Sequence, residues 1–174
     1  MSKESSKTEW FVFYTKSRQE KKVNELLLKN GFESFLPTQK VMRQWSDRKK
    51  RIEVPLFNSY IFVRIEEYRL VEVLKIPGVS WTITHNGKPA FLRQQEYELI
   101  CRYLQTGLFI ESVINPQNFE IGEKVKVIDG PLKGFSGVLT KKNSDTIFSV
   151  FIDTMNYTLS IQLDNSLLQR IYLT

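Results

Sequence analysis

The segment Phe119–Leu139, FEIGEKVKVIDGPLKGFSGVL, is the part of this 174-residue chain that most narrowly limits the fold of its C-terminal part. The valines of EKVKV alternate with lysines at the period of a half-buried strand, and DGP then supplies a turn. A second strand is expected at Gly137 to Lys141. Glycines recur where positive φ or close strand approach would exclude a side chain, at Gly130, Gly134 and Gly137. The segment predicts a small, tightly turned β-barrel.

The rest of the C-terminal part continues this β pattern. Short runs rich in Val, Ile, Phe and Tyr predict five strands in all, at Val125–Ile128, Val138–Lys141, Ile147–Phe151, Tyr157–Leu163 and Leu168–Tyr172. The preceding segment, Gly107 to Asn118, contains turn formers and no periodicity, which is typical of a linker. We therefore expect a barrel domain at residues 119–174, joined to the rest by a linker at residues 107–118.

Residues 10–106 predict a separate α+β domain behind a disordered tail at residues 1–9. WFVFYT at Trp10–Thr15 is apolar on both faces and predicts a central strand. The other expected elements are a helix at Arg18–Asn30, strands at Thr38–Trp45 and Lys50–Val54, a strand after Pro55, a helix at Glu66–Ile76, a strand at Val79–Thr84 and a helix at Arg93–Gln105. This order predicts an antiparallel sheet with helices packed against it.

Positive charge is concentrated in the N-terminal part. Residues 1–105 hold 19 basic and 12 acidic groups, whereas residues 106–174 hold 6 and 7, within an overall charge of +6. The densest cluster, QKVMRQWSDRKKR at Gln39–Arg51, has six basic groups and one acid. It is expected on a hairpin that turns near Ser46-Asp47. A clustered basic face of this kind is a candidate nucleic-acid surface.

Enzymatic, metal-binding and membrane roles find no support in the residue types. A single cysteine, Cys101, can form neither an internal disulfide nor a cysteine-based zinc site, and His85 forms no recognisable nucleophile–base pair with it. No apolar run approaches the roughly 20 residues that span a bilayer, and the polar N-terminus lacks a secretory signal. We expect a cytoplasmic, monomeric protein with no cofactor, no metal and no catalytic residue.

The motifs of both parts resemble one known family. Phe119–Leu139 resembles the KOW motif, and WFVFYT, PLFNSYIFV and IPGV followed by GKPA resemble, in this order, the NGN domain of NusG-type transcription elongation factors. The resemblance covers about residues 10–172 and implies an NGN domain followed by an SH3-like KOW barrel. The PLF-x-x-Y-x-F-V spacing and the WSDRKK hairpin resemble the specialised RfaH and UpxY antiterminators, of which the UpxY type acts on capsular polysaccharide operons.

The resemblance implies a polymerase-binding surface. In the antiterminators, the residues matching Tyr14, Phe57, Tyr60 and Phe62 line a hydrophobic depression that receives the clamp helices of the RNA polymerase β′ subunit. Period two places Tyr60 and Phe62 on one face of their strand but Phe57 on the other, and parity alone favours aromatic side chains that simply pack in the core. With the family match, we expect docking by Tyr14, Tyr60 and Phe62, with Phe57 set apart by its parity.

The resemblance also implies contact with non-template DNA in the transcription bubble. The basic residues matching Lys16 and Lys22 face that strand in RfaH-like factors, and the hairpin adds further candidates, Arg43, Arg48, Lys49, Lys50 and Arg51. A solvated charged face is the alternative for any single lysine. Ser17 stands where RfaH has a second basic residue, and Arg69–Glu72 lacks the hydroxyl groups with which RfaH contacts the β subunit.

Such a factor would favour the closed, elongating polymerase and suppress pausing and termination, while its barrel, a constitutive β domain, recruits a ribosome or another factor. Asn58-Ser59 replaces the Pro-Gly or Pro-Asn pair that is usual before the tyrosine, which suggests a changed entry into the strand. The competing interpretation is an RNA-binding or ribosome-associated KOW protein, in which the barrel contacts RNA.

Overall fold

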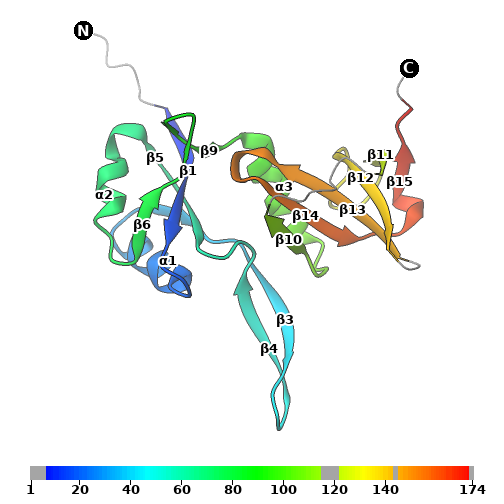
Figure 1. The fold of residues 1–174 in the computed structure, drawn as a ribbon, viewed down its shortest axis with the longest axis horizontal. Coiled ribbons are helices and arrows are strands. Elements are labelled where there is room, and N and C mark those ends of the chain that lie inside the picture. The colour runs from blue at the N-terminus through cyan, green and yellow to red at the C-terminus, as the bar shows by residue number, and fades with distance from the viewer. Residues whose placement is uncertain (1–6, 115–121, 143–144, 173–174) are drawn as a thin grey trace. The chain divides into compact units, whose positions relative to one another are not determined.

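The computed structural model describes residues 7–114, 122–142 and 145–172 (Figure 1). The chain forms two compact units, the first from residues up to 38 and 57–95, and the second from residues 39–56 and from 96 onward. The fold class is α+β with antiparallel sheets, as predicted. The predicted domain boundaries, at 10–106 and 119–174, divide the chain differently and remain a proposal about independent folding.

The first unit is a sheet with two helices. Its strands are β1 (Thr8–Thr15), β2 (Glu33–Phe35), β5 (Tyr60–Glu66), β6 (Val79–Thr82), β7 (Thr84–His85), β8 (Lys88–Pro89) and β9 (Phe91–Leu92). Its helices are α1 (Glu20–Lys29) and α2 (Leu70–Leu74), and a 3-10 turn at Glu67–Arg69 precedes α2. The main sheet has the order β2-β5-β1-β6, with β9 also paired to β1, and β7 with β8 forms a separate hairpin.

Strand β1 is central in this sheet, as its two apolar faces predict. It pairs antiparallel with β5 from Thr8 opposite Glu66 to Tyr14 opposite Tyr60, and it also pairs with β6 and β9. The strand begins at Thr8, inside the segment predicted as a disordered tail, and residues 1–6 lie outside the described residues. The long β1–β5 register therefore determines which side chains share each face.

One face of the sheet packs against α1 and α2. Its core contains alternate residues of the two long strands and the apolar stripes of the helices: Phe11, Phe13, Ile61, Val63 and Ile65 from the strands, Val23 and Leu27 from α1, and Leu70 and Val73 from α2. The Asn30-Gly31 stop is a Schellman motif, because Phe32 N donates to Leu27 O and Gly31 N to Leu28 O, with Gly31 at φ +81.

The second unit contains a β-hairpin, one helix and a six-stranded sheet. The hairpin consists of β3 (Thr38–Gln44) and β4 (Lys49–Pro55), and the helix is α3 (Gln94–Gln105). The sheet has the order β10-β14-β13-β12-β11-β15. Its strands are β10 (Glu111–Ile114), β11 (Glu123–Val127), β12 (Ser136–Lys142), β13 (Asp145–Ile152), β14 (Tyr157–Gln162) and β15 (Leu168–Arg170).

The predicted barrel strands are present, but the sheet is larger than expected. Strands β11 to β15 lie at the five predicted positions. Strand β10 pairs with β14 from within the segment predicted as a linker, where no periodicity indicated a strand. The last linker residues, 115–118, and residues 119–121 of the predicted barrel lie outside the described residues. The sequence therefore missed the edge strand that extends this sheet.

Helix α3 is held to the C-terminal sheet by buried polar contacts. Tyr103 is fully buried, and its hydroxyl donates to Leu159 O at 3.3 Å while its ring stacks 6.5 Å from that of Phe148. The Glu96 carboxylate accepts from Thr154 N at 3.1 Å and from Thr154 Oγ1 at 2.6 Å. Burial raises the pKa of Tyr103 well above its ordinary value. These contacts explain why α3 groups with the second unit.

The three glycines expected to be structurally required, Gly130, Gly134 and Gly137, are required for two different reasons. Gly130 and Gly134 have φ of +79 and +92, in the left-handed region. Gly137 instead lies in β12, where an added Cβ would collide with the backbone oxygen of Ser149 and lie 2.8 Å from Cε2 of Phe148. The two requirements inferred from the sequence, positive φ and close approach of strands, therefore apply to different glycines.

We expect Gly137→Ala to destabilise the protein more than Gly130→Ala. The first substitution forces β12 away from β13, an overpacking that costs roughly 1–3 kcal/mol in addition to lost pairing. The second meets no atom within 4 Å and costs only the left-handed backbone, about 1–2 kcal/mol, less the gain from a stiffer unfolded chain. Urea denaturation followed by circular dichroism measures both; equal losses, or a larger loss for Gly130→Ala, would contradict the close approach.

Candidate functional site

Three aromatic rings meet at one end of the first unit's sheet. Tyr14 of β1 lies opposite Tyr60 of β5 on one side and Trp81 of β6 on the other. The rings of Tyr14 and Trp81 stack with centroids 4.4 Å apart and planes 8° from parallel, and Tyr60 meets Tyr14 edge-on at 5.5 Å. We call these three residues the aromatic cluster. Strand alternation places Tyr14 on the face opposite the α1–α2 core.

The aromatic cluster reaches solvent. Trp81 is 53% exposed, and Tyr14 and Tyr60 are half-buried. Burial raises the pKa of the Tyr60 hydroxyl above its ordinary value, and the neighbouring Tyr14 raises it further, so this hydroxyl stays neutral at physiological pH. Tyrosine and tryptophan suit interfaces because the ring can lie against an apolar partner while the O–H or N–H group stays hydrated.

Phe57 and Phe62 do not reach solvent beside the aromatic cluster. Both are buried, with exposed fractions of 1% and 0%. Their rings meet edge-on at 6.0 Å, and Phe62 also lies 5.9 Å from Phe35. The structure thus brings Phe57 next to Phe62, but of the four residues predicted to bind polymerase only Tyr14 and Tyr60 are partly exposed.

The prediction that Phe57 faces away from Phe62 was wrong. It extended the period of two from β5 back through residues 56–59, but β5 begins at Tyr60 and the preceding residues form a turn. Ser59 has a φ of +64, which breaks the alternation. Phe57 therefore returns to the same side as Phe62, and their rings touch.

A buried carboxylate holds the turn before Tyr60. Ser59 N donates to Glu20 Oε1 at 2.7 Å, and Ser59 O accepts from Thr15 N at 2.8 Å. Glu20 and Ser59 are each 6% exposed. The left-handed backbone at Ser59 explains why glycine or asparagine suits this position, because both tolerate positive φ. The contact from α1 thus fixes the entry of Tyr60 into the sheet.

Trp81 is the site residue that the sequence analysis missed. It lies in a strand of four residues, VSWT, whose length gives too few positions to establish a face. The sequence carries no signal that distinguishes Trp81 from a core residue, because tryptophan is highly buried on average. Its stacking on Tyr14 is what identifies it as part of the cluster.

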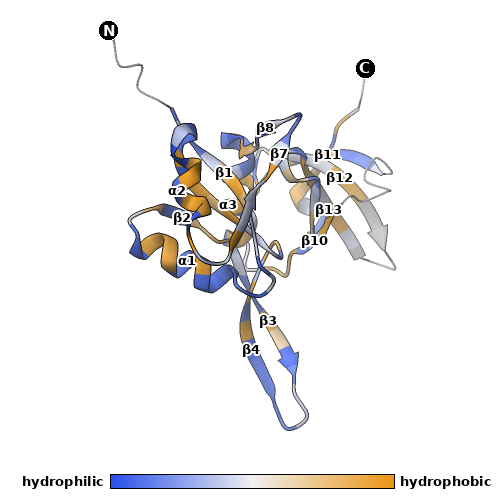
Figure 2. Ribbon diagram, turned by 60° about the vertical axis from the view of Figure 1, so that its left-hand side comes forward, coloured by the Kyte–Doolittle hydropathy of each residue, from blue (hydrophilic) through white to orange (hydrophobic). Residues whose placement is uncertain are grey.

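The predicted nucleic-acid residues fall into two sets. Lys16 and Lys22 belong to the first unit, on the loop after β1 and in α1, and both are exposed. The other set lies on the β3–β4 hairpin of the second unit and is also exposed: Arg43, Arg48, Lys49, Lys50 and Arg51. Figure 2 shows the outer part of this hairpin mainly in hydrophilic colours.

The base of the hairpin is fastened to the segment that follows α3. The Gln39 side chain donates to Ile110 O at 2.8 Å and accepts from Ile110 N at 2.9 Å. Ser112 Oγ donates to Leu56 O. Isolated two-stranded hairpins are marginally stable in water. These three hydrogen bonds therefore stabilise the hairpin at its base.

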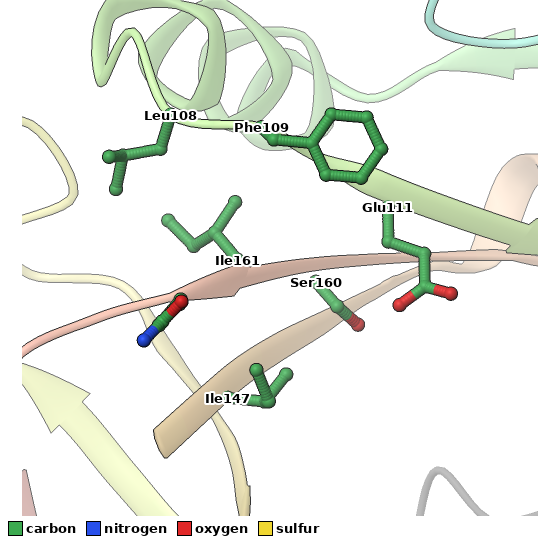
Figure 3. A pocket seen from close by; sticks show the side chains of 7 residues that line it. Leu108, Phe109, Glu111, Ile147, Ser160 and Ile161 are labelled. Carbon is green, nitrogen blue, oxygen red and sulfur yellow. The ribbon is translucent and has the colours of Figure 1, made fainter. Parts of the chain in front are cut away.

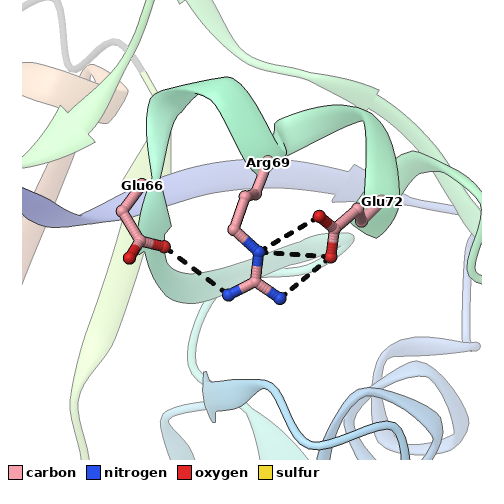
Figure 4. Close-up of polar contacts among 3 residues, drawn as sticks. All are labelled: Glu66, Arg69 and Glu72. Atoms are coloured by element: carbon pink, nitrogen blue, oxygen red, sulfur yellow. Dashed lines mark hydrogen bonds and ion pairs between the residues drawn. The ribbon is translucent and has the colours of Figure 1, made fainter. Parts of the chain in front are cut away.

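The segment Arg69–Glu72, which the resemblance to RfaH aligns with a hydroxyl-rich element, carries an ion-pair network. Arg69 donates to both carboxylate oxygens of Glu72 at 2.9–3.2 Å, and its guanidinium lies 3.5 Å from Glu66 (Figure 4). The hydrogen bond from Arg69 lowers the pKa of Glu72. The guanidinium also lies 5.7 Å from the centre of the Phe32 ring. These groups satisfy one another and offer no free hydroxyl.

No chemical centre is found among the described residues. A pocket of about 230 Å³ in the second unit is mainly apolar, with Glu111 as its one acidic group (Figure 3). Within the described ranges no group of three His, Cys, Asp or Glu side chains could hold a metal ion. Burial raises the pKa of the Cys101 thiol, which makes it a poorer nucleophile. In the same ranges, no helix is long and apolar enough to cross a membrane.

Comparisons with known proteins agree on one family. Residues 8–101 match the family model described as NusG, transcription termination factor nusG. The chain is 27% identical to the transcription termination/antitermination protein NusG of Xylella fastidiosa over 77% of this chain and 83% of that protein. It is 30% identical to the NusG of Neisseria meningitidis serogroup B over 77% and 81%.

A solved structure has the same fold. The structure described as domain interaction in Thermotoga maritima NusG aligns with a TM-score of 0.56 at 24% identity, over 95% of this chain and 98% of that one. At this identity the similarity establishes the fold alone.

We expect Glu20→Ala to destabilise the first unit, because it leaves the buried Ser59 N–H without an acceptor. An unsatisfied buried donor costs about 1–3 kcal/mol. Glu25→Ala is the matched control, since Glu25 is an exposed residue of the same helix. Thermal unfolding followed by tryptophan fluorescence compares the two variants. If both melt at the same temperature, Glu20 does not hold the turn.

Proposed function

This chain belongs to the NusG family of transcription termination and antitermination factors, and on this premise we propose that it is a specialised antiterminator that docks on RNA polymerase through its aromatic cluster. The observation that supports docking most strongly is the partly exposed stack of Tyr14 and Trp81 beside Tyr60. In RfaH-like factors the residues matching Tyr14 and Tyr60 contact the β′ clamp helices, and Trp81 extends that surface here.

The four residues that match the family's docking depression then divide into two roles. Tyr14 and Tyr60 meet the clamp helices, whereas Phe57 and Phe62 are buried and pack against each other beneath the solvent-accessible surface. Substitution of Phe57 or Phe62 acts through the shape of the surface.

The free energy gained by burying the three rings exceeds the free-energy cost of association by little. Three rings that each bury about 150–250 Å² contribute roughly 4–6 kcal/mol apiece at about 25 cal/mol per Å². Association itself costs on the order of 4–15 kcal/mol. Additional contacts are therefore needed, and phosphates of the non-template DNA strand in the bubble supply them.

Lys16 and Lys22 are the candidates for that strand in the first unit. Lys16 follows Tyr14 by two residues, and its N–H donates to Gly78 O at 2.9 Å, which fixes the loop beside the aromatic cluster. A factor docked through Tyr14 therefore carries this cation with it. The hairpin cations add further phosphate contacts, and together these interactions favour the closed, elongating polymerase over pausing and termination.

The target is proposed from the resemblance to UpxY, and the second partner from the resemblance to the family as a whole. We assign the factor to one operon, such as a capsular polysaccharide locus, in the cytoplasm and as a monomer. The C-terminal sheet would recruit a ribosome or another transcription factor. An RNA-binding or ribosome-associated KOW protein is the competing function.

We expect Trp81→Ala to weaken capture of core RNA polymerase by about tenfold or more, because truncation of a central interface aromatic costs roughly 2 kcal/mol or more. Tyr14→Ala and Tyr60→Ala should act in the same direction. Tyr68→Ala is the matched control, since Tyr68 is a 70% exposed aromatic residue of the same unit outside the cluster. Affinity is measured by pull-down and titration with variants shown to fold.

Two outcomes would count against docking by the cluster. One is equal loss of capture in Tyr68→Ala, and the other is unchanged capture in all three cluster variants. Co-purification with ribosomes, without polymerase, would favour the competing function.

A further inference from the structure

The geometry points to the β3–β4 hairpin as a ribbon that binds double-stranded DNA by entering its major groove, a site distinct from the single-strand contacts of Lys16 and Lys22. This inference deepens the proposed function and rests on the nucleic-acid role given there to the hairpin. It specifies the form of nucleic acid that the hairpin takes.

Both faces of the hairpin are open along its outer part. Every residue from Met42 to Arg51 is exposed, and β3 and β4 form a two-stranded sheet that pairs with no other described strand. Even its large apolar side chains are exposed, Met42 by 58% and Trp45 by 56%. No described part of the chain covers either face.

The turn fixes which side chains share a face. Trp45 N donates to Arg48 O at 2.8 Å, so these two residues lie opposite each other across the turn. Alternation from this pair places Arg43 and Lys50 on the face of Trp45 and Arg48, and Lys49 and Arg51 on the other face. Cations therefore project from both sides of the ribbon.

These charges are available for a ligand. The hairpin residues 38–55 carry six basic and two acidic groups. Five of the six hairpin cations form no ion pair with any described residue: Lys40, Arg43, Lys49, Lys50 and Arg51. Arg48 has only its neighbour Asp47, at 4.0 Å. Exposed cations without partners bind phosphates and release the counterions that surround them.

A projecting ribbon with cations on both faces suits a duplex better than a single strand. Single-strand sites are grooves in the protein that follow the backbone, with successive aromatic platforms for the bases. The hairpin is the opposite shape and offers one aromatic ring, Trp45. The major groove of B-DNA, about 12 Å wide, admits a two-stranded ribbon and places a phosphate wall on each side.

The length of the ribbon is sufficient for this insertion. The four residues from Met42 to Trp45 span about 13 Å at roughly 3.3 Å per residue, which exceeds the groove depth of about 8.5 Å. The bonds of Gln39 and Ser112 lie at the opposite end, so they hold the ribbon without blocking it. A-form RNA is excluded as the ligand because its major groove is deep and too narrow for side chains to read.

Fluorescence anisotropy with the full chain tests the site. The probes are a 20-base-pair DNA duplex, its separate single strand and an RNA duplex of the same sequence, at several salt concentrations. We expect the DNA duplex to bind most tightly. If about five phosphates are contacted, log K should fall against log salt with a slope near −4.5.

Removing charge from one face of the hairpin at a time distinguishes insertion into the groove, which uses both faces, from binding through a single face. Arg43→Gln with Lys50→Gln, and Lys49→Gln with Arg51→Gln, should each weaken duplex binding about tenfold and reduce the slope by about 2. Lys124→Gln with Lys126→Gln is the control, because it removes two exposed cations from β11 of the same unit. This control should bind the duplex as the parent protein does.

Several results would overturn the site. They are equal or tighter binding of the single strand or the RNA duplex, an effect confined to one face of the hairpin, or an equal loss in the β11 control. Polymerase capture without DNA keeps the two proposals apart. Hairpin variants should retain that capture, and Trp81→Ala should lose it while still binding the duplex.

Discussion

The antiparallel pairing of β1 with β5 is the constraint on which the first unit depends. From Thr8 opposite Glu66 to Tyr14 opposite Tyr60, it assigns alternate residues of two apolar strands to opposite faces. One set becomes the core against α1 and α2. The other set ends in Tyr14 and Tyr60, onto which β6 adds Trp81. The aromatic cluster is thus a consequence of sheet register, and loosening the pairing would remove the core and the proposed docking surface together.

Most of the fold could be predicted because its elements are long enough to show a pattern. Strand β1 is a run that is apolar on both faces, β11 alternates, β12 to β14 are rich in β-branched and aromatic residues, and helices α1 and α3 show helical spacing. The strands β2, β9 and β10 have two to four residues, too few for a period, and exist through their partners. The packing of α3 on the C-terminal sheet, through Tyr103 and Glu96, likewise depends on contacts between residues about 50–60 positions apart, which local patterns do not encode.

The candidate site was predictable where strand or family spacing reached it. Tyr14, Tyr60 and the hairpin cations lie at the surface, as expected. Phe57 was misplaced because the left-handed Ser59 interrupts the alternation, and Phe62 is buried. The division of the cations between two units was hidden, since it depends on the bonds of Gln39 and Ser112 at the hairpin base. A left-handed residue that interrupts strand alternation, and hydrogen bonds between residues far apart in the chain, are features that a single sequence does not reveal.

Single-round transcription by purified bacterial core RNA polymerase tests the docking role most directly. The template carries a pause site and a terminator, and the full-length RNA is measured with and without the protein. The parent protein should shorten the pause and raise read-through, whereas Trp81→Ala, which lacks the exposed ring of the aromatic cluster, should do neither. Unchanged or increased termination with the parent protein, or equal read-through with Trp81→Ala, would contradict antitermination through this surface.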